Sequence, residues 1–135
     1  MIASYAYTNA IVTQTTTPGE LGKHPVNIPD QTAALWGFYT FRSGSLDGFG
    51  IGGGIRYVGE SPGDELNTFF VPDYVLVDAG FRYDLEKASP QFRGMALNLN
   101  ITNLFDTTYV SQCASDVNCV YGVGRTIIAG LKYRW

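Results

Sequence analysis

Two cysteines are the residues of this sequence with the clearest chemical potential. Cys113 and Cys119 enclose five residues in a segment that joins two apolar stretches of the chain. In an oxidising compartment such a pair forms a disulfide, whereas in a reducing one the two remain unrelated thiols. A metal site needs more ligands, and the one histidine, His24, is distant in sequence. The spacing favours a disulfide that stiffens one loop, by about 2 kcal/mol in the chain-entropy model.

No set of side chains has the pattern of a catalytic site. His24 stands between Lys23 and Pro25 in a long polar segment, where a single histidine is typically solvated, and no second base is available for a triad. The glycine-rich run 48–54 is not a phosphate-binding loop, because no helix start follows it. We therefore predict a protein that is not an enzyme and that has neither a metal site nor a cofactor.

The elements that carry these residues have the pattern of strands. Apolar and polar residues alternate through the last segment of the chain, which ends on Trp135. Three further segments alternate in the same way, and in all four every Lys, Arg, Asp and Asn falls on one parity: 49–58, 75–85, 95–102 and 126–135. The pattern predicts six strands. Their expected bounds are 2–12, 34–42, 49–58, 74–85, 94–103 and 125–135.

Three features favour strands that cross a membrane over those of a soluble β-sandwich, which alternates similarly. The predicted strands are roughly ten residues long, against five or six in soluble sheets. The polar parity is rich in Gly, Ala and Thr, which suits a packed lumen. Aromatic residues gather at strand ends, as at the interfaces of a bilayer: Tyr57, Tyr74, Tyr83, Tyr133 and Trp135. We predict an all-β fold, an antiparallel transmembrane β-barrel segment.

Composition sets further bounds. A chain of 135 residues forms one domain at most, and 45% hydrophobic residues exclude disorder. A net charge of −3 without a basic run argues against nucleic acid as a partner. No apolar window is long enough for a transmembrane helix, and residues 1–4 do not begin a signal peptide. Because an outer-membrane protein is exported, we expect that Met1 is not the natural start.

The connections between the predicted strands alternate in length. Residues 13–33, 59–73 and 104–124 form long connections, whereas 43–48 and 86–93 form short ones. Outer-membrane barrels place short turns in the periplasm and long loops outside. The cysteine loop is therefore expected to face outward.

Several residues of the polar parity allow two interpretations. Trp36 and Phe38 either meet a partner in the lumen or pack there. The glycines of the same parity, including Gly50, Gly52 and Gly54, either let another backbone approach closely or ease strand curvature. The charged residues of this parity pair with a partner or with each other, and their alternating signs favour mutual pairing. They are Arg56, Asp78, Arg82, Asp84, Lys132 and Arg134.

Residues 97–110 resemble the penultimate-strand signature of TonB-dependent outer-membrane receptors. In that family an Asn-x-x-Asn-Leu-Phe-Asp-x-x-Tyr run precedes a loop and a final strand that ends in an aromatic residue. The matching residues are Asn100, Asn103, Leu104, Phe105, Asp106 and Tyr109. Runs at 27–29 with 34–36, 54–59, 71–74 and 121–126 extend the resemblance to ferric-siderophore receptors of the ferrichrome type.

The resemblance implies a barrel of about 22 strands, plugged by an N-terminal domain, that imports ferric siderophores with energy delivered through TonB. The sequence contains neither the plug nor a TonB-contacting segment, so we expect residues 1–135 to be the C-terminal portion of the barrel domain. Its implied partners are outer-membrane lipid, the missing plug and barrel strands, TonB through the missing part, and the outer-membrane assembly machinery. Leu131, Tyr133 and Trp135 on the closing strand are the implied assembly signal. The siderophore supplies its own iron ligands.

Contacts with the ligand are expected from the outer loops and the upper strand ends. Aromatic residues suit a bulky, partly apolar siderophore, although each of them could instead pack a loop or anchor at the interface. The candidates are Trp36, Phe69, Phe70, Tyr109 and Tyr121.

Two rival hypotheses remain at this point. One is a non-transporting structural or adhesive outer-membrane barrel segment that closes by oligomerising, with three or four chains completing a wall. The other is a soluble β-sandwich in which Leu97, Leu99 and Ile101 face a packed core.

Overall fold

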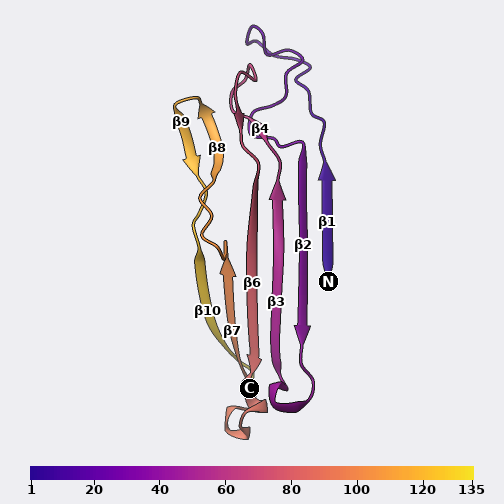
Figure 1. Cartoon of the computed structure of the whole chain (residues 1–135), viewed down its shortest axis with the longest axis vertical. Coiled ribbons are helices and arrows are strands. Elements are labelled where there is room, and N and C mark those ends of the chain that lie inside the picture. The colour runs from indigo at the N-terminus through magenta and orange to yellow at the C-terminus, as the bar shows by residue number, and fades with distance from the viewer.

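Six antiparallel strands form one sheet in the computed structural model, which describes all 135 residues (Figure 1). In spatial order the strands are β1 (Ile2–Tyr7), β2 (Gln31–Thr40), β3 (Phe49–Val58), β6 (Tyr74–Asp84), β7 (Met95–Thr102) and β10 (Thr126–Tyr133). Two small hairpins lie in the long connections: β4 (Ser61–Pro62) with β5 (Phe70–Val71), and β8 (Val110–Ser115) with β9 (Asn118–Tyr121). The short connections contain the 3₁₀ helices η1 (Gly44–Leu46), η2 (Leu85–Lys87) and η3 (Pro90–Phe92).

The predicted strands are present, and most of their bounds are close to those expected. β3 has the predicted bounds, and β6, β7 and β10 end within two residues of theirs. β2 begins three residues and ends two residues earlier than predicted, and β1 is much shorter, because it ends at Tyr7 rather than at residue 12. Beyond it the chain bonds to its own loop, where Val12 N–H donates to Lys23 C=O and Gly22 N–H donates to Val12 C=O.

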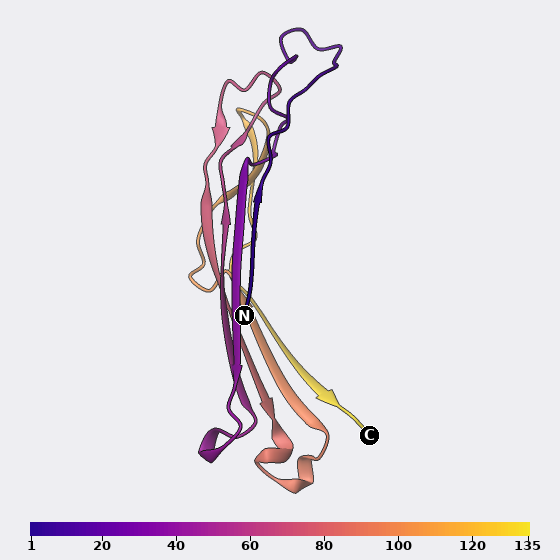
Figure 2. The ribbon, with the colours of Figure 1, turned by 90° about the vertical axis from the view of Figure 1, so that its right-hand side faces the viewer.

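The sheet is a single bowed layer, with no second sheet or helix packed on either face (Figure 2). Leu97 is 46% exposed, although it belongs to the parity that a sandwich would bury. The hypothesis of a soluble sandwich is therefore wrong. The structure contains no helix with the length and apolar character of a membrane-crossing one.

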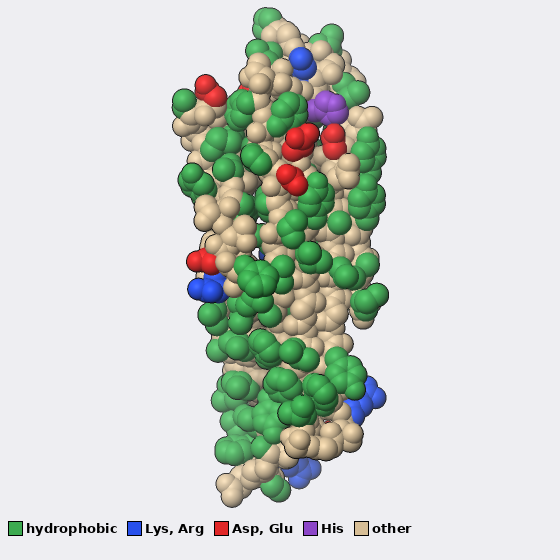
Figure 3. All heavy atoms as spheres, in the orientation of Figure 1, with side chains coloured by type: hydrophobic (Ala, Val, Ile, Leu, Met, Phe, Trp, Pro, Cys, Tyr) green, Lys and Arg blue, Asp and Glu red, His purple; other side chains and the backbone are tan.

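Strand register keeps the two parities on opposite faces of the sheet. Leu35 of β2 lies opposite Ile55 of β3, and Ile55 lies opposite Val77 of β6, so apolar residues form continuous rows. We call this side the apolar face and the other the polar face. Figure 3 shows hydrophobic side chains gathered over the lower half of the sheet, whereas acidic side chains gather near the long loops.

A furrow of glycines on the polar face is filled by two aromatic rings of the neighbouring strand. A β carbon at Gly50 would lie 2.6 Å from the ring of Phe38, and one at Gly52 would lie 2.5 Å from it. The ring of Trp36 covers Gly54 in the same way. The rings therefore lie along the sheet wall. This role of the glycines differs from both sequence interpretations, since the sheet's own side chains fill the space that the absent side chains leave.

Aromatic residues form a ladder on the apolar face near the short connections. Phe49 stacks on Phe41 with ring centroids 6.3 Å apart and on Phe81 at 6.4 Å, while Tyr39 meets Phe41 edge-on at 5.0 Å. Tyr74, expected to join such an interfacial belt, belongs instead to the polar face, because it shares the parity of Asp78 on β6.

All three long connections lie at one end of the sheet and both short ones at the other (Figure 1). At the short end, Lys87 Nζ lies 3.1 Å from Asp47 Oδ2, which joins the two short connections. The hydrogen bond from Lys87 to Asp47 raises the pKa of the Lys87 ammonium.

Candidate ligand site at the long-loop end

Three long loops meet at one end of the sheet: L1 (residues 8–30), L2 (59–73) and L3 (103–125). L1 packs on the other two loops through two asparagine side chains. Both asparagines, Asn27 and Asn67, have positive φ angles, 60° and 54°. Asparagine is one of the few residues other than glycine that adopts this conformation readily.

Asn27 binds L1 to both neighbouring loops. Its side-chain Nδ2 donates to Cys113 C=O at 2.9 Å, and its Oδ1 accepts from Cys113 N–H at 3.0 Å. Its backbone N–H donates to Pro62 C=O at 2.9 Å. A single residue of L1 therefore contacts L2 and L3 at once.

Asn67 makes the same kind of paired contact in the opposite direction, from L2 to L1. Its Oδ1 accepts from His24 N–H at 2.8 Å, and its Nδ2 donates to His24 C=O at 2.9 Å. The imidazole of His24 is 39% exposed, with Nδ1 3.6 Å from Asp30 Oδ1.

Cys113 and Cys119 form the predicted disulfide, which joins β8 to β9 where the two residues lie opposite one another. Cys113 is 3% exposed. The hairpin is therefore held at the residue to which Asn27 also binds.

A cleft of about 900 Å³ lies between L2 and the disulfide hairpin. Its lining combines Phe69 with polar residues of L2 and of the hairpin and with Asn27 of L1. Asp64, Glu65 and Asp116 are its charged residues, all of them acidic. The site therefore suits a ligand with hydrogen-bond donors and some apolar surface.

Asp64 fixes the turn of L2 that carries Phe69. Its carboxylate accepts from the Thr68 hydroxyl at 2.7 Å and from Thr68 N–H at 2.6 Å. The hydrogen bond from the Thr68 hydroxyl, with those from backbone N–H groups, lowers the pKa of the Asp64 carboxyl below its usual range. The turn is therefore organised around an ionised carboxylate.

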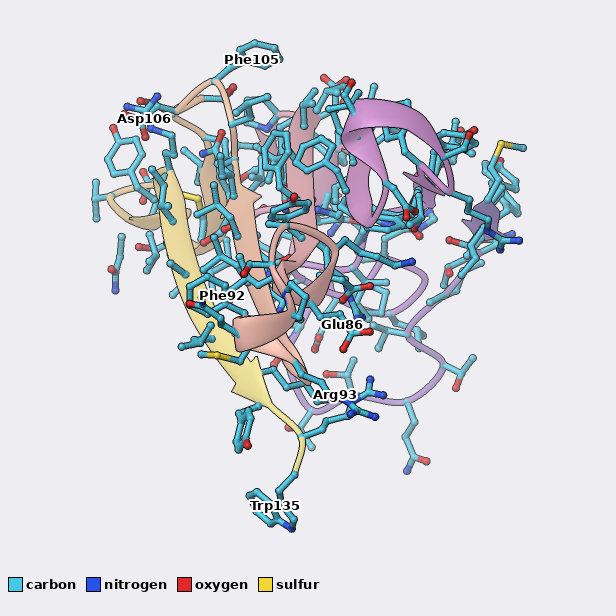
Figure 4. The ribbon with its side chains drawn as sticks, turned by 90° about the horizontal axis from the view of Figure 1, so that it is seen from below. Glu86, Phe92, Arg93, Phe105, Asp106 and Trp135 are labelled. Carbon is cyan, nitrogen blue, oxygen red and sulfur yellow. A yellow bond between two sulfur atoms is a disulfide. The ribbon has the colours of Figure 1, made fainter.

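The Asn-Leu-Phe-Asp run ties the end of β7 to the start of β10. Asn103 is 3% exposed, and its side chain bonds Thr107 twice, at 2.8 and 2.9 Å, and Val123 C=O at 3.3 Å. Asp106 Oδ1 accepts from Arg125 N–H at 2.6 Å. Phe105, between them, points away from the sheet (Figure 4) and is 71% exposed. The motif thus forms a cluster of hydrogen bonds within L3, made by Asn103 and Asp106, which we call the L3 knot although the chain is not threaded.

Below this knot an ion pair lies on the polar face. Arg56 Nε is 2.6 Å from Asp78 Oδ2, and Arg56 Nη2 is 3.0 Å from Asp78 Oδ1, which also accepts from Asn103 N–H at 2.9 Å. The rings of Tyr74 and Tyr109 lie beside the pair, with centroids 4.3 Å apart. The polar face and the L3 knot are thereby connected.

Mutual pairing explains four of the six charged residues of the polar face. Arg82 also pairs with a neighbour, Asp84, at 2.9 Å. Lys132 and Arg134 form no ion pair within the chain. They line a small pocket with Arg82, Asp84 and Glu86 at the short-connection end.

The five aromatic residues expected to contact a ligand do not form one cluster. Phe69 lines the cleft, whereas Trp36 lies over Gly54 on the polar face. The ring of Tyr109 lies on Gly122, where any side chain would collide with it. Phe70 on β5 and Tyr121 on β9 are 49% and 69% exposed.

The closing strand leaves the expected assembly residues uncovered. Leu131, Tyr133 and Trp135 are 60%, 57% and 102% exposed. Trp135 lies beyond the last strand residue and points away from the sheet (Figure 4). The same view shows Glu86, Phe92 and Arg93 together in the short connection between β6 and β7.

The sequence alone does not reveal Asn27 and Asn67 as structural residues of this site. Asn27 lies in one of the runs that carry the family resemblance, and Asn67 lies in a polar stretch with turn composition. An asparagine in such a stretch can signal a positive φ angle. The residue in another loop to which each asparagine binds cannot be recognised from the neighbouring sequence.

The family model described as "TonB dependent receptor-like, beta-barrel" matches residues 1–104 of the chain. The "Ferrichrome outer membrane transporter/phage receptor" of Escherichia coli strain K12 is 40% identical over 135 residues, which is 100% of this chain and 18% of that protein. The "Ferrioxamine B receptor" of Salmonella typhimurium strain LT2 is 39% identical over 131 residues, 97% of this chain and 18% of that protein. The chain thus spans about a fifth of the length of these curated relatives.

Solved structures agree with these relatives. The siderophore receptor PiuA from Acinetobacter baumannii superposes with a TM-score of 0.76 at 28% identity, over 97% of this chain and 19% of that one. The ferric preacinetobactin receptor BauA from the same organism gives a TM-score of 0.80 at 25% identity, over 96% of this chain and 18% of that one. The single bowed sheet is therefore a segment of such a barrel.

Proposed function

The chain belongs to the TonB-dependent receptor family, whose members are outer-membrane β-barrels, and from this premise we propose that it is the C-terminal portion of a barrel that imports ferric siderophores. The plug, the remaining strands and TonB, acting through the parts outside this chain, are its proposed partners. The apolar face is the lipid side of the wall, and the polar face lines the lumen. The long loops then face outward.

One observation carries the proposal, namely the cleft of about 900 Å³ where the three long loops converge. Its size is within the range of small-molecule sites, and it combines an aromatic ring with polar groups. The siderophore is the cargo and brings its own iron ligands, so the cleft needs to recognise only the organic shell.

Among the expected aromatic contacts, we assign the first contact to Phe69, which lines the cleft. Phe70 and Tyr121 are exposed aromatic residues that directly follow the cleft residues Phe69 and Val120 in sequence. Tyr109 and Trp36 lie on the luminal side and are assigned to later steps of passage.

The test is uptake of radioactive iron by cells that lack their own receptors and express the complete receptor containing this chain. Ferrichrome and ferrioxamine B, named in the relatives, are the first ligands to supply. We expect uptake of at least one of them, and we expect it to stop when TonB is removed. Uptake of neither, or uptake that continues without TonB, would contradict the proposal.

Phe69→Ala provides a residue-level test of the cleft. Loss of a ring that contacts the ligand is expected to raise the half-saturating siderophore concentration about tenfold. Phe92→Ala is the matched control, because Phe92 is an exposed aromatic residue at the opposite end of the barrel wall. Equal effects of the two substitutions would remove Phe69 from the site.

Residues 1–135 exported alone are expected to give no uptake. The free edges of β1 and β10 leave backbone groups unpaired, and each such group costs several kcal/mol in lipid. The rival hypothesis of a structural barrel that closes by oligomerising predicts instead a membrane-inserted assembly of three or four chains, which native mass measurement would detect.

A further inference from the structure

Two asparagine side chains join the three outer loops, and their bonds surround the cleft. Asn27 binds both the N–H and the C=O of Cys113, and Asn67 binds the same two groups of His24. Asn27 is itself a cleft residue, and Asn67 lies between the cleft residues Leu66 and Thr68.

We infer that Asn27 and Asn67 are positioning residues that hold L1, L2 and the disulfide hairpin in one arrangement and so keep the cleft in its ligand-binding shape. The inference rests on the proposed function, since it concerns the same cleft. The affinity of the cleft for its ligand then depends partly on Asn27 and Asn67, whose side chains bind other loops.

The geometry explains why both residues are asparagine. Each position requires a positive φ angle and a side chain that donates to a carbonyl while accepting from the N–H of the same residue. Aspartate lacks the donor, and glycine tolerates the angle but lacks both groups. Each amide therefore satisfies both backbone groups of its partner residue, Cys113 for Asn27 and His24 for Asn67.

The disulfide is part of this arrangement. Cys113 is the residue that Asn27 binds, and its position in the hairpin is fixed by the bond to Cys119. Breaking the disulfide frees the backbone of Cys113 to move, which removes the partner of Asn27. The loss of Asn27 and the loss of the disulfide should then have effects that do not add.

The experiment measures siderophore binding and outer-membrane level in the complete receptor. Asn27→Asp and Asn67→Asp keep size and positive-φ tolerance but lose the donor, and Asn9→Asp in L1 is the control, because Asn9 is exposed and makes no side-chain hydrogen bond. We expect dissociation constants for iron-loaded ferrichrome or ferrioxamine B to rise roughly five- to twentyfold in the two variants, as the binding-competent arrangement becomes less populated. The dissociation constant of the control variant should stay near that of the parent. The outer-membrane levels of all three variants should also stay near the parent level. Affinities that stay unchanged in both variants would overturn the inference.

Asn27→Gly replaces Asn27→Asp if the latter does not reach the membrane, because glycine keeps the backbone conformation. Combining the Asn27 variant with Cys113→Ser and Cys119→Ser should weaken binding no further than the larger single effect. Fully additive losses would contradict a shared role.

Amide exchange provides the readout that is independent of ligand. Exchange at Cys113 and His24 should accelerate at least tenfold in Asn27→Gly and Asn67→Gly, which remove the side-chain oxygen that accepts from these two N–H groups, with the amides of the six-stranded sheet unchanged. If the parent binds neither siderophore, the proposed function fails, and these amides still decide the inference: faster exchange supports the joining of the loops, and unchanged exchange overturns it.

Discussion

Replacing Asn103 by alanine should open the knot between β7 and β10. The substitution removes three side-chain hydrogen bonds, two with Thr107 and one with Val123, from a residue that is 3% exposed. It also forces alanine into a φ angle of 52°, which costs about 1 kcal/mol. With about 0.5–1.5 kcal/mol for each hydrogen bond, some of it recovered by water in the opened loop, the expected loss is about 2–4 kcal/mol of local stability.

Amide exchange at Thr107 and Arg125 measures this local opening directly in the complete receptor, because both N–H groups bond within the knot. A loss of this size corresponds to exchange roughly 30- to 1,000-fold faster. Asn103→Gly should cost about 1 kcal/mol less than alanine, since glycine accepts the positive φ angle.

Asn98→Ala is the matched control for this prediction. Asn98 lies on the polar face of the same strand and makes no side-chain hydrogen bond in the structure. Exchange in Asn103→Ala that is no faster than in Asn98→Ala would refute the assignment of Asn103 as the centre of the knot.

Three further predictions concern the faces, the end and the outer turn of the segment. Leu99→Arg on the apolar face should cost about 2–4 kcal/mol near the bilayer midplane and Asn98→Arg on the polar face much less, as measured by unfolding from lipid vesicles; equal costs would contradict the assignment of the faces. Deleting Trp135 should lower the outer-membrane level of the complete receptor several-fold, with inserted copies still binding ligand, whereas unchanged levels would leave Trp135 an interfacial anchor only. The folded pKa of Asp64 lies below its unfolded value, so its contribution to the order of L2 is complete above the unfolded pKa of about 4 and is lost as pH falls through the folded value. As the pH is lowered below about 4, siderophore binding should weaken in the parent and change less in Asp64→Asn. Identical pH profiles of the two proteins would show that ionised Asp64 does not order L2.

The strands could be predicted from sequence because their signal is local. Alternation requires only neighbouring residues, so β3, β6, β7 and β10 were placed to within two residues. β1 was extended too far because residues 8–12 keep strand-like composition, although they bond to L1 itself. The short strands β4, β5, β8 and β9 were not predicted, since two to six residues contain too little periodicity to be recognised.

The site was less predictable because its contacts join distant parts of the chain. Asn27 binds Cys113, 86 residues away, and no periodicity encodes that pairing. The disulfide was predictable because its two residues are six apart. Of the five aromatic candidates, Phe69 alone lines the cleft. The sequence does not reveal which of them would do so, because the direction of a loop side chain depends on the turn, and here the turn is organised by Asp64.

The rings that fill the glycine furrow bear on how this wall can change during evolution. Trp36 leaves no room for a β carbon at Gly54, and Phe38 leaves none at Gly50 or Gly52. A larger residue at any of these glycines is therefore acceptable only after the facing ring has become smaller, and a smaller ring leaves a hollow in the wall until a glycine is replaced. These positions should accordingly vary in compensating pairs among descendants of this sequence, with intermediates that carry one change alone being the least stable.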